Sequence, residues 1–413
     1  MKPTQQTIAE LIESMPPSPK LVERIRKQFG TQLADECLAA ANLQIKARRK
    51  FGDGIWWVTE KSLQQATPWQ VAKLKATWLG NGTIYDLCCG VGGDSIGFAR
   101  QTLDRPENAQ TNIVAVDVDP VLIRFAQANL DWTFSQMQAT ATASVVGADV
   151  TQMTLPNRVS VHIDPDRRAM DRSKNRSVNG RSIRPEDYKP TLDQTMRLLE
   201  NTDAALIKMA PAAALPESIV NVSHRSWISL SGSVREQTVL LGNAMERAGQ
   251  LANRVSAVAV DFEGNAQSFS IGSDQPPSGP SLKTEPASAP GQIMVDPDAA
   301  IRAAGLTEAF AQQYQLQTLG GPAGFLTGDG LGASAKDIPM AIVGQVAYSG
   351  SCDNRKLRRE LRSRNYSVQR VKVRGTDHDP ATWSRQLRDC GEIPVTLWIG
   401  RTRKRVYAAI TEI

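Results

Sequence analysis

Residues 84–94, Ile-Tyr-Asp-Leu-Cys-Cys-Gly-Val-Gly-Gly-Asp, join an apolar stretch to a glycine-rich turn that ends in a carboxylate. Gly90, Gly92 and Gly93 lack the side chains that would keep a ligand away from the backbone. Residues 95–99 resume a helical pattern, and the first amides of such a helix can face that ligand. The segment therefore predicts a strand, a cofactor-binding turn and a helix. By itself it does not say which nucleotide-like cofactor binds.

Two kinds of cofactor are compatible with this turn. A dinucleotide site favours Gly-x-Gly-x-x-Gly, but Ser95 stands where the third glycine is needed. The turn does fit Asp-x-x-x-Gly-x-Gly-Gly, with Asp86 before it, and this pattern resembles the first motif of class I methyltransferases, which use S-adenosylmethionine. An acidic residue there complements the ammonium group at the methionine end of that cofactor.

Further acids follow the next two predicted strands. Residues 113–117 end at Asp117, with Asp119 two residues later, and a carboxylate at a strand end can accept both ribose hydroxyls. NAD enzymes share this feature, so it does not discriminate. Asp149 follows residues 144–147, where adenosylmethionine enzymes commonly contact the adenine amine; the alternative is a helix cap or turn acid. Three acids that end three successive strands beside the glycine turn favour S-adenosylmethionine.

Charged residues also follow the fourth predicted strand, residues 159–163. They read Asp164-Pro165-Asp166-Arg167-Arg168, and the carboxyl edge of an open α/β sheet is where substrates bind. In methyltransferases that act on exocyclic amines, the corresponding motif is Asp or Asn, two prolines and an aromatic residue. Asp164 and Pro165 match it, so we expect them to be catalytic, with Asp164 orienting the nucleophile or accepting its proton. Asp166 and Arg167 depart from the motif, which leaves the acceptor open.

The candidate contacts to the substrate are cationic. Arg167 and Arg168 belong to this edge, and Lys208 closes the fifth predicted strand toward it. Residues 167–184 hold seven Lys or Arg against one acid, so an anionic substrate suits the edge. His162, which lies between apolar residues, is predicted to be a buried, hydrogen-bonded histidine rather than a base.

The elements that must position these residues alternate strand and helix from residue 84, as in a parallel α/β sheet. Candidate strands are 84–88, 113–117, 144–147, 159–163 and 204–209, followed by an antiparallel pair near 227–230 and 237–241 and by strand-like residues at 256–260 and 267–271. We expect a Rossmann-like, seven-stranded class I methyltransferase core. Residues 7–50 read as short amphipathic helices broken at 16–19, and residues 68–79 as a helix.

Composition divides the chain into four regions. We expect an N-terminal helical region or cap (1–65), a methyltransferase domain (66–271), a linker (272–292) and a small C-terminal α+β domain (293–413). The linker holds 12 Pro, Gly or Ser in 21 positions. In the last domain, helices are expected at 296–316, 354–364 and 380–389, and strands at 341–348, 367–373, 394–399 and 406–410.

These motifs together resemble bacterial class I methyltransferases with a THUMP-like C-terminal domain, whose catalytic half is similar to trimethylguanosine synthase. The resemblance covers most of residues 45–413 and is carried by residues 57–59, 86–94, 116–120, 164–168, 296–303 and 373–380. It implies that S-adenosylmethionine is bound by the acids named above, by the rest of the turn, and by the segment Trp57-Val-Thr59 packing over the cofactor. The turn residues concerned are Cys88, Gly90, Gly92, Gly93 and Asp94.

The basic character of the chain is concentrated at its C-terminal end. The formal charge is +6, and residues 351–413 hold 15 Lys or Arg against 7 acids. Residues 355–374 contain nine Lys or Arg, and residues 401–405 add four. Such clusters supply the phosphate contacts of nucleic-acid binding, so we expect RNA as a partner, with a solvated surface as the alternative. THUMP-like domains are usually associated with RNA, which agrees.

The sequence thus predicts an S-adenosylmethionine-dependent methyltransferase that acts on RNA by direct transfer of the sulfonium methyl. Two alternatives stay open: a non-catalytic RNA-binding protein that retains the fold, and a small-molecule methyltransferase. The five cysteines and three histidines lack metal-ligand spacing, so no metal is expected. With no signal peptide and no run of about 18 apolar residues, we expect no membrane partner and a cytoplasmic protein.

Overall fold

The computed structural model describes residues 5–104, 111–136, 141–171, 176–271, 286–329, 338–403 and 405–412; of residues 104, 168–171 and 176–181 it describes the backbone alone. The chain forms two compact units. The first comprises Met1–Leu230, Arg235–Arg254 and Val260–Ala266. The second comprises Ser231–Val234, Val255–Ala259 and Gln267–Ile413. Most of the expected linker, residues 272–285, lies outside the described residues.

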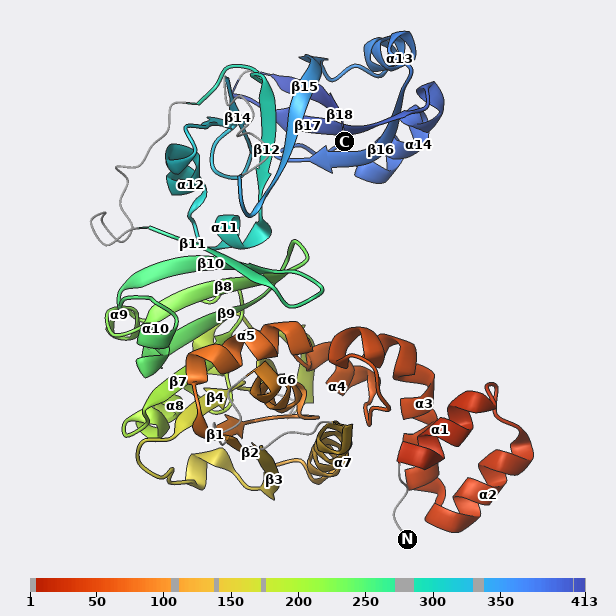
Figure 1. Cartoon of the computed structure of the whole chain (residues 1–413), viewed down its shortest axis with the longest axis vertical. Helices are drawn as coiled ribbons and strands as arrows, with labels where there is room; N and C mark the ends of the chain where they lie inside the picture. Colours follow the sequence, from red (N-terminus) through yellow and green to blue (C-terminus); the bar gives the residue numbers. More distant parts are fainter. Residues whose placement is uncertain are drawn as a thin grey trace. The chain divides into compact units, whose positions relative to one another are not determined.

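The larger sheet has nine strands in the order β11-β10-β8-β9-β7-β4-β1-β2-β3 (Figure 1). Neighbouring strands from β3 to β7 are parallel, and β9 is antiparallel to β7. The sheet has two strands more than the predicted seven, because β10 and β11 continue it beyond β8. The bounds are β1 (Gly82–Leu87), β2 (Thr111–Asp117), β3 (Thr142–Gly147), β4 (Ser160–Ile163), β7 (Ala204–Met209), β8 (His224–Leu230), β9 (Ser233–Gly242), β10 (Arg254–Val260) and β11 (Ala266–Ser270).

Apolar side chains cover both faces of this sheet. Successive residues of a strand point to opposite faces, and β2 accordingly sends Ala115 into one buried cluster and Val116 into another. The first cluster also holds Phe51, Ile96 and Phe125. Helices of this unit are α1 (Gln5–Glu13), α2 (Pro19–Phe29), α3 (Thr31–Phe51), α4 (Glu60–Gln65), α5 (Trp69–Leu79), α6 (Gly93–Gln101), α7 (Pro120–Gln136), α8 (Leu192–Leu199), α9 (Glu217–Val220) and α10 (Asn243–Arg247).

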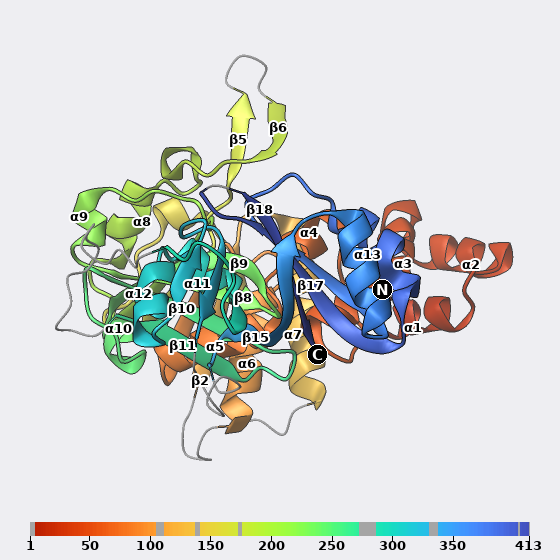
Figure 2. The same cartoon turned by 90° about the horizontal axis from the view of Figure 1, so that it is seen from above.

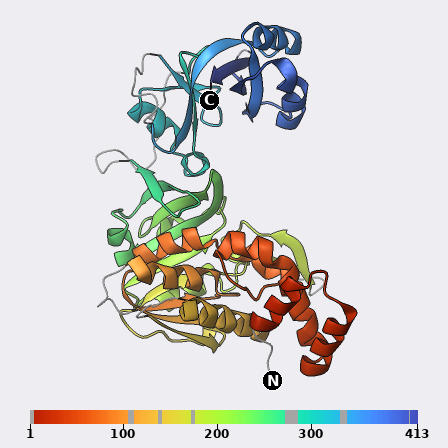
Figure 3. The same cartoon turned by 45° about the vertical axis from the view of Figure 1, so that its right-hand side comes forward.

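The N-terminal helices α1, α2 and α3 lie together at one side of the first unit, where they are coloured red in Figure 3. Ser18 caps α2, since its side chain accepts a hydrogen bond from the Leu21 amide. The helix α3 is 21 residues long and places Ala34, Cys37 and Phe51 in the core. These helices end at Phe51, and the extended segment that follows leads to α4.

A two-stranded antiparallel ribbon follows β4 in the sequence. Its strands are β5 (Arg168–Asp171) and β6 (Arg176–Arg181). Figure 2 shows it projecting away from the sheet. Sequence patterning did not predict this ribbon. It carries most of the basic segment 167–184 on a backbone that extends past the end of β4.

The second unit is built on a seven-stranded sheet of order β13-β14-β12-β15-β18-β17-β16. Asp296 and Pro297 belong to β12, so the helix expected over 296–316 is wrong at its start, and Gly305 with φ 72° separates the rest into two short helices. The elements are β12 (Ile293–Pro297), α11 (Ala299–Ala303), α12 (Thr307–Gln313), β13 (Gln317–Leu319), β14 (Phe325–Gly328), β15 (Ala341–Ser351), α13 (Asn354–Ser363), β16 (Tyr366–Val373), α14 (Pro380–Leu387), β17 (Ile393–Arg401) and β18 (Val406–Glu412).

Candidate active site

A pocket of about 630 Å³ lies where the parallel strands β1, β2, β3 and β4 end. The strand order reverses between β1 and β4, which is the place where open α/β sheets bind ligands. Four turns line the pocket, at residues 88–94, 117–119, 148–151 and 164–167, together with parts of residues 62–67 and 189–194. The pocket therefore gathers the segments that the sequence singled out.

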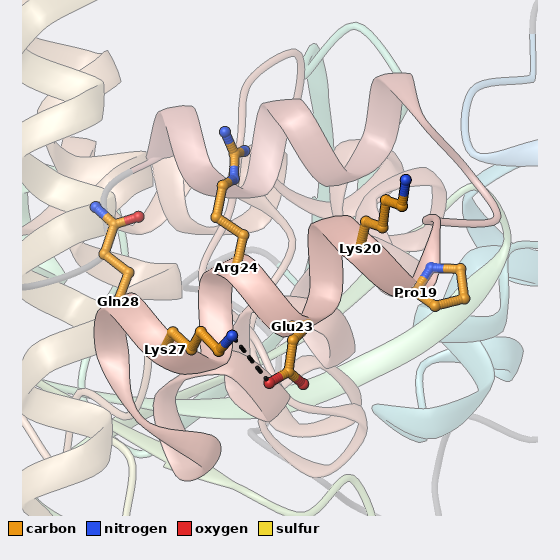
Figure 4. Close-up of a pocket in the computed structure, with 6 residues that line it drawn as sticks. All are labelled: Pro19, Lys20, Glu23, Arg24, Lys27 and Gln28. Carbon is orange, nitrogen blue, oxygen red and sulfur yellow. Dashed lines mark ion pairs between the residues drawn. The ribbon is translucent and has the colours of Figure 1, made fainter.

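A second hollow on the surface runs along α2 and is lined by Pro19, Lys20, Glu23, Arg24, Lys27 and Gln28 (Figure 4). All six residues come from one helix, and the Glu23–Lys27 ion pair at 3.9 Å is exposed. Such an open helix surface cannot exclude water from a bound ligand. We therefore take the pocket at the strand ends as the candidate site.

The glycine turn brings the backbone of residues 90–93 close to its neighbours. The Gly90 amide donates to Oδ2 of Asp117 at 2.9 Å, which ties the turn to the end of β2. A Cβ atom on Gly93 would lie 3.1 Å from Cβ of Ala66, so α6 begins tightly against the segment before α5. Gly90 and Gly93 line the pocket; Gly92, with φ 83°, shapes the turn outside that lining.

Asp117 is the last residue of β2 and Asp119 lies two residues after it; both line the pocket. Asp117 is 9% exposed; burial raises the pKa of its carboxyl, although amide hydrogen bonds from Asp119 and Gly90 oppose the shift. Oδ1 of Asp119 accepts the Val121 amide at 2.8 Å at the start of α7. Each carboxylate oxygen can accept a second hydrogen bond, so Asp117 can still receive hydroxyl groups of a ligand.

Asp149 both caps a short turn and lines the pocket, while its contact with adenine stays a prediction. It caps a short 3₁₀ turn, because Oδ1 accepts the amide and the hydroxyl of Thr151 at 2.9 and 2.7 Å. These hydrogen bonds lower the pKa of the Asp149 carboxyl. The side chain also lines the pocket, so the cap fixes a carboxylate at the wall.

Cys88 lines the pocket in the left-handed region, with φ 58°. Burial raises the pKa of the Cys88 thiol well above its usual range, and Asp117 adds to the shift. Burial does the same for Cys89. A thiol is nucleophilic as its thiolate, so neither cysteine is activated for covalent chemistry. Cys88 contributes shape to the pocket.

The structure does not place Asp86 in the pocket. Asp86 is fully buried in β1, where Oδ2 accepts the Ser95 hydroxyl and Oδ1 contacts Nδ1 of His162 at 2.8 Å. The two residues are register partners in the parallel strands β1 and β4, so the contact follows from strand pairing. His162 is 0% exposed with both ring nitrogens in contact, which confirms the prediction of a buried, hydrogen-bonded histidine.

The segment from Trp57 to Thr59 lies beside the pocket wall and outside the lining. Trp57 is 4% exposed and its backbone exchanges two hydrogen bonds with the Asn129 side chain. Thr59 begins α4 in a capping box with Ser62. Ser62 and Gln65 of α4 line the pocket, so this segment contributes to the pocket by fixing the start of that helix.

Asp94 is the lining carboxylate with the most contacts. Burial would raise the pKa of its carboxyl, but the positive charges around it, Lys75 before Lys208, together outweigh burial and hold that pKa below its usual range. Oδ1 lies 2.5 Å from Nζ of Lys75, and Oδ2 accepts the Thr67 hydroxyl at 2.6 Å. Lys75 is itself fully buried and also pairs with Glu236 of β9 at 3.0 Å.

Asp164, Pro165 and Arg167 all line the pocket where β4 ends. Oδ2 of Asp164 accepts from Nζ of Lys208 at 2.7 Å, and the Asp164 side chain is 25% exposed. Lys208 is outside the lining and contacts Asp164 from the interior of the unit, and the substrate contact predicted for it stays a prediction. The side chain of Arg168 lies outside the described residues.

Sequence reasoning missed Thr67, Lys75 and Glu236. Lys75 occupies a position of α5 flanked by the buried Val71, Ala72 and Ala76, and a lysine within such an apolar stripe is a signal of an internal ion pair. Glu236 lies in β9 beside a run of buried residues and carries the same signal. Only the tertiary fold shows that the two residues meet.

The charges of the pocket favour a cationic ligand. Among the described residues that line it, six are aspartates and two are cationic; the aspartates are Asp94, Asp117, Asp119, Asp149, Asp164 and Asp166, and the cations Arg167 and Lys189. A sulfonium with an ammonium group matches this balance, whereas the diphosphate of a dinucleotide would meet an excess of like charge. The residues therefore fit S-adenosylmethionine better than NAD.

Two mycobacterial proteins align with almost the whole chain. MT3122 of Mycobacterium tuberculosis (strain CDC 1551 / Oshkosh) and Rv3037c of strain ATCC 25618 / H37Rv are each 27% identical to it over 386 residues. The alignment covers 91% of this chain and 95% of each relative, and both are described as uncharacterized S-adenosylmethionine-dependent methyltransferases. No known protein-family profile matches the chain.

A solved structure shares the fold over the full length. It is that of a proposed methyltransferase of Porphyromonas gingivalis W83, with a TM-score of 0.69, 14% identity and coverage of 100% of this chain and 99% of that one. At this identity the likeness concerns the fold alone. The predicted enzyme class and cofactor are confirmed by these comparisons: the chain is an S-adenosylmethionine-dependent methyltransferase of mixed α/β, Rossmann-like fold.

The described residues lack two features, a membrane-spanning helix and a metal-binding group of side chains. None of the helices in the described ranges is long and apolar enough to cross a membrane. In the same part of the chain, no group of three or more His, Cys, Asp or Glu side chains is arranged to hold a metal ion.

Proposed function

We propose that this methyltransferase modifies RNA, with Asp164 at the acceptor side of the pocket and the second unit as an RNA-binding, THUMP-like domain. The observation that carries the RNA assignment is the cationic face of α13. Leu357 and Leu361 of this helix are buried, while its outer face exposes four cations. These are Arg355, Lys356, Arg359 and Arg362.

The contacts of the basic residues support a role in binding phosphate. Among the described residues, the ion pair found on this exposed face joins Arg359 to Glu360 at 3.8 Å, so most of its charge is available to an anion. By contrast, Lys372 of β16 and Arg374, which follows that strand, pair with Asp296 at 2.7 and 3.4 Å. Exposed cations that release counterions to a phosphate backbone give strong, salt-dependent binding.

The chemistry proposed at the pocket needs few protein groups. S-adenosylmethionine, when bound, supplies an activated methyl group, so the residues mainly orient the nucleophile and exclude water. Asp86 affects the pocket through its contact with His162. Asp94, Asp117 and Asp149 provide carboxylates on the side of the pocket that binds the cofactor. Asp164 presents its carboxylate to an N–H or O–H of the acceptor, and that proton leaves to Asp164 or to water as the methyl group is transferred.

Arg167 is proposed to hold the acceptor where other enzymes use an aromatic ring. It sits two residues after Pro165 in the lining, and among the described lining residues no Phe, Tyr or Trp occurs. A planar guanidinium can stack on a base and pair with a phosphate. Arg167→Lys would keep the charge but lose the plane, and should raise the KM for RNA more than it lowers kcat.

The proposal is tested by transfer of labelled methyl to RNA from a strain that lacks this gene. The wild-type protein should label that RNA, and Asp164→Asn should label it at least about 10-fold more slowly, as expected on losing a positioned proton acceptor. Asp193→Asn, an exposed acid of α8, is the matched control and should keep the wild-type rate. Equal rates for the two variants would contradict the role of Asp164.

A further inference from the structure

A continuous series of polar side chains connects the cofactor side of the pocket to its acceptor side. Its members come from segments far apart in the sequence, and the side chains other than Asp164 are less than 10% exposed. In order of contact they are Asp86, His162, Lys75, Asp94, Thr67, Lys208 and Asp164, with Glu236 beside Lys75.

The proton positions at Lys75 follow from its chemistry. An ammonium group has three N–H donors and no acceptor, and Lys75 has three partners: Asp94 at 2.5 Å, Glu236 at 3.0 Å and Nε2 of His162 at 3.0 Å. Nε2 of His162 is therefore an acceptor, and Nδ1 carries the hydrogen that is donated to Asp86. Burial would lower the pKa of Lys75, but Asp94 and Glu236 outweigh it and raise that pKa.

The same reasoning fixes the hydroxyl of Thr67. Nζ of Lys208 lies 2.8 Å from Thr67 Oγ1 and 2.7 Å from Oδ2 of Asp164, and it can only donate to both. Thr67 therefore accepts from Lys208, and its one hydroxyl hydrogen points to Oδ2 of Asp94 at 2.6 Å. The Thr67 hydroxyl and the Lys208 ammonium group therefore link the carboxylate of Asp94 to that of Asp164.

We propose that Thr67 and Lys75 are positioning residues of methyl transfer. Lys75 fixes Asp94 on the cofactor side. Thr67 is hydrogen-bonded to both Asp94 and Lys208, and Lys208 in turn holds Asp164 on the acceptor side. The proposal rests on the proposed role of Asp164. Preorganised carboxylates need not rearrange during the reaction, and groups that support such residues are as important as the residues themselves.

A purely structural role explains the series less well. Buried ion pairs seldom stabilise a fold more than apolar side chains of similar size would. This series crosses the fold from β9 to α5 and α6, and two of its carboxylates, those of Asp94 and Asp164, line the pocket. Polar groups with shifted pKa values are common at functional sites, because burial and neighbouring charges are arranged there to suit the chemistry.

The test compares Thr67→Val with Thr67→Ser. Valine keeps the shape of threonine but removes the hydroxyl, whereas serine keeps the hydroxyl. We expect Thr67→Val to lower kcat for RNA methylation about 10- to 100-fold, the usual effect of removing an outer partner of a site residue. Affinity for S-adenosylhomocysteine, measured by calorimetry, should stay within about threefold, and Thr67→Ser should restore kcat.

Thr133→Val is the matched control. Thr133 is also buried in the first unit, and its hydroxyl donates to the Asn129 carbonyl at 2.8 Å, away from the lining. It should lose a similar amount of thermal stability and keep its kcat. A Thr67→Val enzyme with wild-type kcat, or one whose kcat falls only as much as that of Thr133→Val, would overturn the proposal.

A readout that needs no acceptor separates this inference from the RNA assignment. If the wild-type enzyme binds S-adenosylhomocysteine but labels no RNA, the RNA proposal fails, and crystal structures of Thr67→Val and Thr67→Ser then decide the inference. Loss of the Lys208–Asp164 contact in the valine variant, with its return in the serine variant, supports positioning by Thr67. An unchanged contact in both variants overturns it.

Discussion

Replacing Lys75 with methionine should cost the protein about 3–5 kcal/mol of folding free energy, because it removes the cation from a buried ion cluster. Lys75 is 0% exposed, and its side-chain partners Asp94 and Glu236 are 7% and 1% exposed. Methionine fills nearly the same volume, so the loss comes from the two carboxylates left without a cation and little of it from a cavity.

Urea unfolding of the first unit, followed by tryptophan fluorescence, gives the free energy directly. Lys61→Met is the matched control, since Lys61 is exposed on α4 and its loss should change stability by about 0.5 kcal/mol or less. The double variant Lys75→Met with Glu236→Gln should lose less than Lys75→Met alone, because one of the stranded carboxylates is gone.

The pH dependence adds an independent check. In the wild-type protein the folded pKa of Asp94 is lowered, so the stability it contributes is present above its unfolded value of about 4 and is lost as pH falls below it. Without Lys75, burial raises that pKa, and the variant takes up protons in the folded state as pH falls. The difference between wild type and variant should therefore shrink from pH 8 to pH 5. A loss below about 1 kcal/mol, or one that does not change with pH, would refute the placement of Lys75.

Three further predictions follow from the same unit. Asp117→Asn should weaken S-adenosylhomocysteine binding about 10- to 100-fold by calorimetry, the worth of a charged hydrogen bond, while Asp131→Asn on the exposed side of α7 should not. Gly97→Ala should destabilise the fold by about 1–3 kcal/mol in thermal unfolding, because its Cβ would overlap that of Ala72 between α5 and α6. Cys88 should react with iodoacetamide at pH 7.5 far more slowly than free cysteine, because burial raises its pKa, and bound cofactor should slow it further; a rate equal to that of free cysteine would contradict the pocket geometry.

The gathering of these segments in one pocket was predictable because their signals are local. A glycine turn and acids at strand ends lie within a few residues of the elements that position them, and Gly90, Asp117 and Asp149 accordingly meet in one pocket. Parallel strand ends share an edge whatever the rest of the chain does. Local pattern also predicted α5 and the strands of the central sheet.

The contacts that position the site could not be predicted in this way. The sequence predicted Asp86 as a cofactor residue. In the structure its position in β1 is paired with that of His162 in the neighbouring strand β4, and its carboxylate points to this histidine in the core. Lys75 and Glu236 lie 161 positions apart in the sequence, and no spacing rule links them. The available signal was a charged residue at a buried position of a helix, Lys75, and another at a buried position of a strand, Glu236. That signal does not say which residue is the partner.

Labelling by fraction tests the central claim most directly. Lysate of a strain that lacks this gene, incubated with the purified enzyme and methyl-labelled S-adenosylmethionine, would be separated into RNA, protein and small molecules. We predict that enzyme-dependent label enters the RNA and that Asp164→Asn abolishes most of it. Enzyme-dependent label confined to protein or small molecules would contradict the RNA assignment, and label absent from every fraction would contradict the proposed transfer site.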